Sequence, residues 1–293
     1  YIFYHAELII FLEREFMEYD LEFLRRKLNS FEPMVRKRYL YYDSKFRESD
    51  FGITIPPHIR QMYRSSLGWC AKAVDSLADR LVFKEFSNDL FDLNEIFNLN
   101  NPDIFFDSAI LSALISSCCF IYISMGNEDY PRLQIIEGSE ATGVIDPITG
   151  LLKIGYAVLD KTENGNPKTE VIFLPDRTEY YLEGKIYSSV KNPAGVPLLV
   201  PIIYRPDAVR PFGRSRITRA SMYFQAHAKR TLERADVTAE FYSFPQKYVV
   251  GLSQDAEPLD KWKATVSSML QFTKDDEGDS PKLGQFSQPS MSP

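Results

Sequence analysis

The stretch that decides the architecture runs from Gly213 to Leu252 and reads GRSRITRASMYFQAHAKRTLERADVTAEFYSFPQKYVVGL. Ser215 can cap a helix, and about thirty residues without glycine or proline follow it before Pro245. The residues at 247–251 have the composition of a short strand. We therefore expect one long helix over residues 213–243, which leads into a small second unit.

One face of this helix consists mostly of small side chains. Its members follow one another at steps of three and four residues, so they share one side of a helix. They are Ile217, Ser221, Phe224, Ala228, Thr231, Ala235, Thr238 and Tyr242. Small residues let two helix backbones come close, so this small-residue stripe is suited to packing between helices. An ordinary surface helix is the alternative interpretation. Gln225 lies off the stripe, and leucine at that position is expected to be mild.

The other faces of the helix carry charges, and four of the cations are candidates to face DNA: Arg219, Lys229, Arg230 and Arg234. The chain as a whole is acidic, because 34 lysines and arginines stand against 40 aspartates and glutamates, a net charge of −6. Neutralisation of phosphates supplies most of the affinity of DNA-binding proteins. The composition therefore gives no sign of a protein that grips DNA tightly.

In the chain before this helix, the spacing of apolar residues changes once, from a helical period to a strand-like one. Helical spacing predicts helices within residues 6–117: over 6–29, from Pro33 onward, over 57–81, and over 103–117, which should be buried. From 118 to 205, short apolar runs predict strands in an antiparallel meander, with turn signals at 146–150, 163–166 and 182–185. We expect residues 1–212 to form one α+β domain, with the helices first and the sheet second.

The chain after the helix is expected to form a small α/β unit. Strand-like residues at 247–251 and 282–286 flank an amphipathic segment at 259–272 and an acidic loop at 274–281. A unit of this size buries little apolar surface by itself, so it is expected to be stabilised by contacts with neighbouring copies.

Motifs for catalysis, metal binding and nucleotide binding are missing from the sequence. It lacks GxxxxGK[ST], HExxH and CxxC, and His5, His58 and His227 are far apart. The acidic run at 275–279 lacks the spacing and the closing glutamate of a calcium loop. We therefore expect a protein that is not an enzyme and that needs no cofactor or metal.

The composition is that of a globular protein, with 44% hydrophobic residues. The apolar stretch from Ala109 to Met125 is interrupted by serines and too short to span a bilayer, so no membrane partner is expected. The first residues lack a basic region followed by an apolar run, so no signal peptide is expected. The three cysteines, Cys70, Cys118 and Cys119, are expected to be buried free thiols.

Five stretches in a fixed order resemble the portal proteins of tailed double-stranded DNA bacteriophages of the siphophage type. IRQMYRSSLGWCAKAVDSLADRL and FFDSAILSALISSCCFIYI are similar to the two wing helices of that family. NPAGVPLLVPIIYRPD is similar to its proline-rich strand. GRSRI with the long helix, and then FPQKYVVG, resemble its stem and the strand that follows. The resemblance extends from about residue 30 to about residue 290.

This resemblance implies a domain organisation. Residues 1–212 would be the wing, 213–243 the stem helix, and 244–293 a clip domain. A returning stem helix, a channel loop and a crown would follow in the family, so this chain is expected to be a shortened form of the subunit. The clip would dock a terminase or a connector protein, with candidate residues Pro245, Lys247, Lys261, Trp262, Asp275 and Asp276.

The resemblance also implies a function. Subunits of a phage or a prophage would form a ring, commonly a dodecamer, at one capsid vertex of the virion, after assembly in the bacterial cytoplasm. Double-stranded DNA would pass through the ring during packaging and ejection. The partners would be terminase, capsid and scaffolding proteins, and head-to-tail connector proteins. Two alternatives stay open: a cytoplasmic nucleic-acid-processing enzyme subunit with an unrecognised metal site, and a monomeric adaptor protein.

Overall fold

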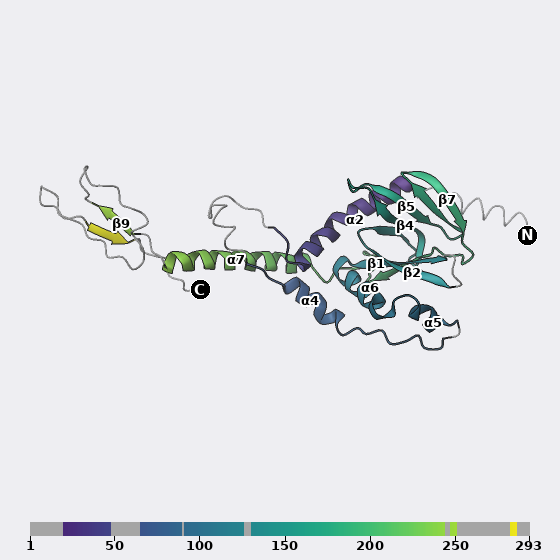
Figure 1. The fold of residues 1–293 in the computed structure, drawn as a ribbon, viewed down its shortest axis with the longest axis horizontal. Coiled ribbons are helices and arrows are strands. Elements are labelled where there is room, and N and C mark those ends of the chain that lie inside the picture. The colour runs from purple at the N-terminus through teal and green to yellow at the C-terminus, as the bar shows by residue number, and fades with distance from the viewer. Residues whose placement is uncertain are drawn as a thin grey trace, which may run out of the picture. The chain divides into compact units, whose positions relative to one another are not determined.

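A computed structural model describes residues 20–47, 65–89, 91–125, 130–243, 247–250 and 282–285 (Figure 1). The chain divides into two compact units. The larger comprises Tyr1–Glu48 and Leu67–Gln225, and the smaller comprises Ser49–Ser66 and Ala226–Pro293. Helices and two antiparallel sheets make up the described part of the larger unit, which agrees with the predicted mixed α+β class.

The helices of the larger unit surround one buried helix. They are α2 (Leu21–Tyr42), α4 (Trp69–Ala78), α5 (Leu93–Asn98) and α6 (Pro102–Ser116). Helix α6 packs against α2, α4 and the strands β1 (Cys118–Met125), β2 (Pro131–Glu137) and β8 (Leu199–Ile203). Its apolar residues face all directions, and Phe105, Ala109 and Leu114 are among those buried. The prediction of a buried helix is confirmed for the second half of α6, whereas Asp103, Ile104, Asp107 and Ser108 in its first half are exposed.

Helix α2 corrects the prediction of one helix that ends at Asn29 and a second that starts at Pro33. The structure has a single helix from Leu21 to Tyr42, with Pro33 inside it. Proline removes one helical hydrogen bond, which weakens a helix locally. Leu24, Leu28 and Val35 are buried on both sides of the proline, so packing holds the helix together across it. Asp20 caps its start and accepts a hydrogen bond from the Phe23 N–H at 2.7 Å.

Helix α4 is shorter than the predicted helix over 57–81. Residues 65–68 are not helical, and the helix begins at Trp69 after Gly68. Glycine is unfavourable inside a helix because it loses the most backbone freedom, and here it marks the boundary. Much of the earlier part of the predicted segment, together with the predicted helix over 6–29 up to residue 19, lies outside the described residues.

The larger sheet has five antiparallel strands in chain order. They are β3 (Ala141–Ile145), β4 (Leu152–Lys161), β5 (Pro167–Phe173), β6 (Arg177–Leu182) and β7 (Lys185–Lys191). The three predicted turns join β3 to β4, β4 to β5, and β6 to β7. Gly150, Gly165 and Gly184 adopt positive φ angles in these turns. The predicted meander is confirmed for β4 to β7, and β3 is a further strand that was not predicted.

The second sheet departs from a single meander. Its order is β2 (Pro131–Glu137), β1 (Cys118–Met125) and β8 (Leu199–Ile203), so the last strand returns to pair with the first. In the antiparallel register, Cys118 pairs with Ile203 and Tyr122 with Leu199. The chain crosses from the five-stranded sheet to this one because both sheets must bury an apolar face.

Successive side chains of a strand point to opposite faces of the sheet, and this alternation explains the layers of the larger unit. Ile154, Tyr156 and Ile172 of the five-stranded sheet pack against Leu24 and Leu28 of α2. Val171 and Phe173, from the other face, pack against Phe120 and Tyr122 of β1. The opposite face of β1 places Cys119 against Ala109 and Ala113 of α6. Neighbouring residues of one strand thus contribute to two cores.

The smaller unit contains most of the long helix α7 (Arg219–Ser243), and the strands β9 (Lys247–Val250) and β10 (Lys282–Gln285). The strands pair antiparallel, with Lys247 opposite Gln285. Both were predicted as strands, whereas the predicted helix over 259–272 lies outside the described residues. In the part of the chain that the structure describes, no helix is both long and apolar enough to cross a bilayer. The three cysteines are buried and free, as predicted.

Candidate functional site

The segment 213–217 anchors the long helix to the larger unit. Gly213 has a φ of +73° and donates its N–H to the Arg210 carbonyl at 2.9 Å. The Arg214 N–H donates to the Tyr204 carbonyl at 2.9 Å, just after β8. The Arg216 N–H donates to the Leu114 carbonyl of α6 at 2.8 Å. Three backbone hydrogen bonds therefore hold this segment, which we call the anchor, before α7 begins.

Ser215 has a different role from the predicted helix cap. Its hydroxyl donates to the Ile115 carbonyl at 2.6 Å and accepts the Ile217 N–H at 2.9 Å. The last carbonyls of a helix have no partner within the helix, and Ser215 satisfies one at the end of α6. Thr218 caps α7 instead, because its hydroxyl accepts the Ser221 N–H at 3.1 Å. The long helix consequently starts at Arg219 rather than near Ser215.

Arg216 extends the anchor to a further helix. Its side-chain Nε donates to the Ala73 carbonyl of α4 at 2.7 Å. From the other side, the Arg38 guanidinium of α2 donates to the Ser116 carbonyl at the end of α6. A cation near the C-terminus of a helix interacts favourably with the helix dipole. The end of α6 is therefore held by both the anchor and α2.

Gln225 corrects the expectation that a leucine at this position would be mild. Its side chain is fully buried. Its Oε1 accepts the Cys70 N–H of α4 at 2.7 Å, and its Nε2 donates to the Tyr41 carbonyl of α2 at 3.1 Å. The Cys70 N–H lies in the first turn of α4, where N–H groups have no partner within the helix, and the Tyr41 carbonyl at the end of α2 also accepts the Ser44 N–H at 3.3 Å. One amide thus completes the start of α4 and the end of α2.

We expect Gln225→Leu to lower the free energy of unfolding by about 1–3 kcal/mol, because the buried Cys70 N–H would lose the Gln225 acceptor and the Tyr41 carbonyl would lose one of its hydrogen bonds. Urea denaturation of the two proteins measures the difference. Gln134→Leu is the matched control, since Gln134 is exposed on β2 and the substitution is the same. Equal losses for the two variants would contradict the bridging role of Gln225.

The residues of the small-residue stripe differ in how much of each side chain is exposed. Ile217 is buried in a core with Leu114 and Met222, so its contacts are internal. The other positions are more accessible: Ser221, Ala228 and Thr238 are half-buried, and Phe224, Thr231 and Ala235 are exposed. The Tyr242 side chain lies outside the described residues.

Both threonines of the stripe satisfy their hydroxyl groups inside the helix. Thr231 donates to the His227 carbonyl at 3.0 Å, and Thr238 donates to the Arg234 carbonyl at 2.8 Å. A hydroxyl that is already bonded needs no partner when its surface is covered. The stripe can therefore be buried by another helix without leaving these polar groups unpaired.

The structure describes only some of the other predicted site residues. Arg219 and Arg234 are exposed, whereas Lys229 and Arg230 are half-buried and have interaction partners. Lys247 begins β9, but its side chain is not among those described. The remaining clip candidates lie outside the described residues: Pro245, Lys261, Trp262, Asp275 and Asp276. Within the described residues, no three His, Cys, Asp or Glu side chains are placed to hold a metal ion.

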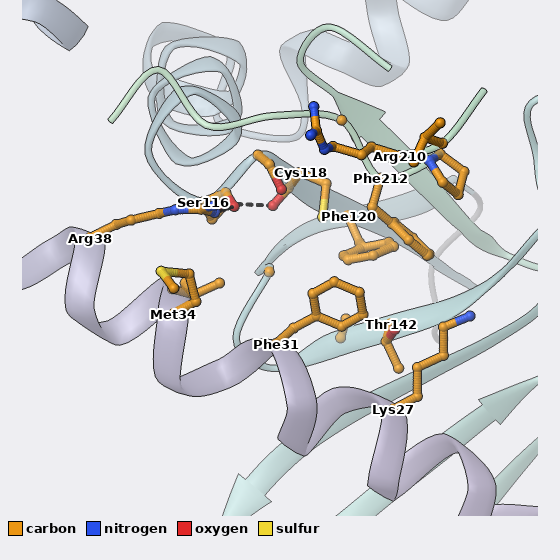
Figure 2. Close-up of a pocket in the computed structure, with 17 residues that line it drawn as sticks. Lys27, Phe31, Met34, Arg38, Ser116, Cys118, Phe120, Thr142, Arg210 and Phe212 are labelled. Carbon is orange, nitrogen blue, oxygen red and sulfur yellow. Dashed lines mark hydrogen bonds between the residues drawn. The ribbon is translucent and has the colours of Figure 1, made fainter. Parts of the chain in front are cut away.

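The sequence interpretation missed a pocket of about 350 Å³ beside the anchor. Figure 2 shows Lys27, Phe31, Met34 and Arg38 along one side of α2, with Phe212 opposite them. The spacing of these four α2 residues places them on one helix face. The predicted break of the helix at Pro33 split this face into two, which is why the pattern was not recognised.

Comparison with known proteins points to one class, the portal proteins of bacteriophages. The chain is similar to the portal protein of Mycobacterium phage L5, with 24% identity over 272 residues, which cover 84% of this chain and 54% of the relative. It is also similar to the portal protein of Mycobacterium phage D29, with 24% identity over 279 residues, which cover 86% and 56%.

The predicted resemblance to phage portal proteins is thereby confirmed, while an origin in a prophage stays a prediction. The chain spans just over half the length of these relatives. No family model matches the chain.

Proposed function

We propose that the chain is a subunit of a phage portal, a structural ring at one vertex of the capsid through which double-stranded DNA enters and leaves. The observation that carries the proposal is the similarity to two portal proteins over more than four-fifths of the chain. In this proposal residues 1–212 form the wing, 213–243 the stem helix and 244–293 the clip. The protein has no catalytic role of its own, and a separate terminase supplies the energy for packaging.

The net charge of the chain supports a channel through which DNA slides rather than a protein that binds DNA tightly. A net charge of −6 gives no general attraction for phosphates. DNA must slide through a portal, and strong phosphate contacts would oppose that movement. The proposed DNA-facing cations are confined to the long helix: Arg219, Lys229, Arg230 and Arg234.

The paired strands β9 and β10 support a clip that depends on its neighbours. Among the described residues of the smaller unit these two strands pair only with each other, and a two-stranded ribbon by itself is at best marginally stable in water. In a ring, adjacent copies would supply the missing contacts, and the assembled clips would offer a surface to terminase and later to connector proteins. Capsid and scaffolding proteins are the partners proposed for the wing.

Negative-stain electron microscopy of the full-length protein tests the proposal. We expect annular particles, because a head-to-tail contact that closes on itself makes a ring. Light scattering that showed only monomers of the full-length protein would refute it. Nuclease or ATPase activity that purified with the protein, and that a carboxylate substitution abolished, would favour a nucleic-acid-processing enzyme.

The small-residue stripe gives a prediction about assembly. Ala228→Leu in the full-length protein should reduce the yield of rings, because added volume in a close helix–helix contact costs about 1–3 kcal/mol at each interface. Ala226→Leu is the matched control, since Ala226 lies on the opposite side of α7 and is also half-buried. Size exclusion measures ring yield, and thermal melting measures the fold. Equal ring yields would show that this face is not an assembly surface.

A further inference from the structure

The larger unit has two apolar hollows whose charges are opposite. The first is the pocket beside the anchor, which we call the basic groove (Figure 2). Three cations line it, Lys27, Arg38 and Arg210, and no carboxylate does. The second lies between residues 82–85, α5 and the start of α6, and we call it the acidic groove.

The basic groove combines an apolar wall with three cations: Arg210 is exposed, Lys27 and Arg38 are half-buried, and the Arg38 guanidinium also donates to the Ser116 carbonyl. The rings of Phe31 and Phe212 meet edge to face with centroids 6.0 Å apart, and the Lys27 ammonium lies 5.4 Å from the centre of the Phe212 ring. Arg210 makes only a long ion pair, 3.7 Å, with Asp207, which the Arg214 side chain also binds. Val209 is 85% exposed at the mouth of the groove. This groove would accept an apolar group that is accompanied by negative charge.

The acidic groove has a volume of about 610 Å³ and a floor of aromatic rings. The Phe83 ring lies 4.8 Å from that of Phe97 and 4.4 Å from that of Phe106, centre to centre. Three exposed carboxylates and one ammonium line its rim: Glu85, Asp103, Asp107 and Lys84. The rim is therefore net negative.

Large apolar side chains near the acidic groove face solvent. Val82, which lines the groove, is 73% exposed, and Ile104, which follows the lining residue Asp103 in α6, is 58% exposed. Single apolar residues on a surface are normal, but a cluster rimmed by charges marks an interaction site. The acidic groove and its surroundings thus offer the combination that the basic groove lacks, apolar groups accompanied by negative charge.

We propose that the acidic groove of one copy docks at the basic groove of the next copy. The inference rests on the proposed ring and deepens it by naming the surfaces that meet. Opposite charges across an interface fix the register and suppress wrong pairings. A head-to-tail contact between two different patches generates a ring when its rotation closes.

The positions of the two grooves allow one copy to use both at once. They share no lining residue. Helix α2, which supports the basic groove, and helix α5, which borders the acidic groove, lie well apart within the larger unit in Figure 1. Each copy can therefore contact one neighbour through each groove, as a ring requires.

A charge swap in the full-length protein tests the proposal. The first variant carries Lys27→Glu and Arg210→Glu, and the second carries Glu85→Lys and Asp107→Lys. Each should lower the association constant between copies by about tenfold or more, since like charges would then face each other across the contact. The variant with all four substitutions should recover rings, because its grooves are again of opposite charge. Size exclusion with light scattering measures the ring fraction, and circular dichroism checks the fold.

Matched controls are Lys185→Glu and Glu163→Lys, which reverse exposed charges outside both grooves. If Lys27→Glu does not fold, Lys27→Gln with Arg210→Gln makes the same comparison with neutral side chains. Rings that form equally well in all variants, or a fourfold variant no better than the others, would overturn the docking while leaving the portal proposal intact. An unmodified full-length protein that forms no ring would overturn both.

Discussion

Replacing Arg25 with methionine is expected to lower the free energy of unfolding by about 3–5 kcal/mol, because it leaves a buried charge without its partner. Glu170 of β5 is completely buried. Its carboxylate accepts two hydrogen bonds from the Arg25 guanidinium, one of them at 2.7 Å, and a third from the Tyr156 hydroxyl. The pair joins α2 to the centre of the five-stranded sheet. Urea denaturation of the two proteins measures the loss.

The acid dependence of stability should change in the same variant. Burial by itself would raise the pKa of Glu170, but the hydrogen bonds from Arg25 and Tyr156 lower it below its usual value. A carboxyl whose pKa is lower in the folded state contributes stability above its unfolded pKa of about 4.3 and loses it as the pH falls through the folded value. The difference between the unmodified protein and Arg25→Met should therefore be largest near neutral pH and shrink in acid.

Two further variants separate the buried pair from ordinary surface charge. Arg36→Met removes an exposed arginine from the same helix, where the ion pair with Glu32 should contribute less than about 1 kcal/mol. Adding Glu170→Gln to Arg25→Met should recover much of the loss, since the buried group is then neutral. If Arg25→Met cost no more than Arg36→Met, the buried pair would not be what holds α2 on the sheet.

Replacing Gly213 with alanine should destabilise the protein by about 2–5 kcal/mol, as two costs combine. The φ of +73° is unfavourable for any residue with a Cβ atom. A Cβ atom built there would lie 2.2 Å from the Tyr204 carbonyl oxygen, so the backbone of the anchor would have to move. We also expect fewer rings from the full-length variant, because the start of α7 would lose its fixed position.

Gly150 provides a control with the same backbone conformation. It also has a φ of +73°, but a Cβ atom at that position would meet nothing within 4 Å. Gly150→Ala should therefore cost only the conformational part, about 1–2 kcal/mol. Thermal melting of both variants measures the difference. A loss for Gly213→Ala no greater than that for Gly150→Ala would show that the close approach to Tyr204 does not matter.

Much of the candidate site could be predicted from sequence, but the partners of its residues could not. The long helix and its small-residue stripe follow from spacing, since helical period needs only the order of residues. The docking of Ser215 on the end of α6 joins residues 100 positions apart, and Gln225 meets Cys70 across 155 positions. A glutamine in an otherwise accessible helix gives no local signal of burial. The basic groove was missed because Pro33 marks a helix start in sequence terms, although here it lies inside α2.

The sequence by itself determined the elements whose signals are local. Helix α6, the turns with Gly150 and Gly165, and the strands β4 to β7 were predicted, because apolar period and turn chemistry act over a few residues. The ordered motifs also determined the resemblance to phage portal proteins. Only the tertiary structure decided that α2 continues through Pro33, that β8 returns to β1, and that Glu170 is buried with Arg25. Each of these outcomes depends on packing and hydrogen bonding between distant segments, which outweigh local preference where a core forms around them.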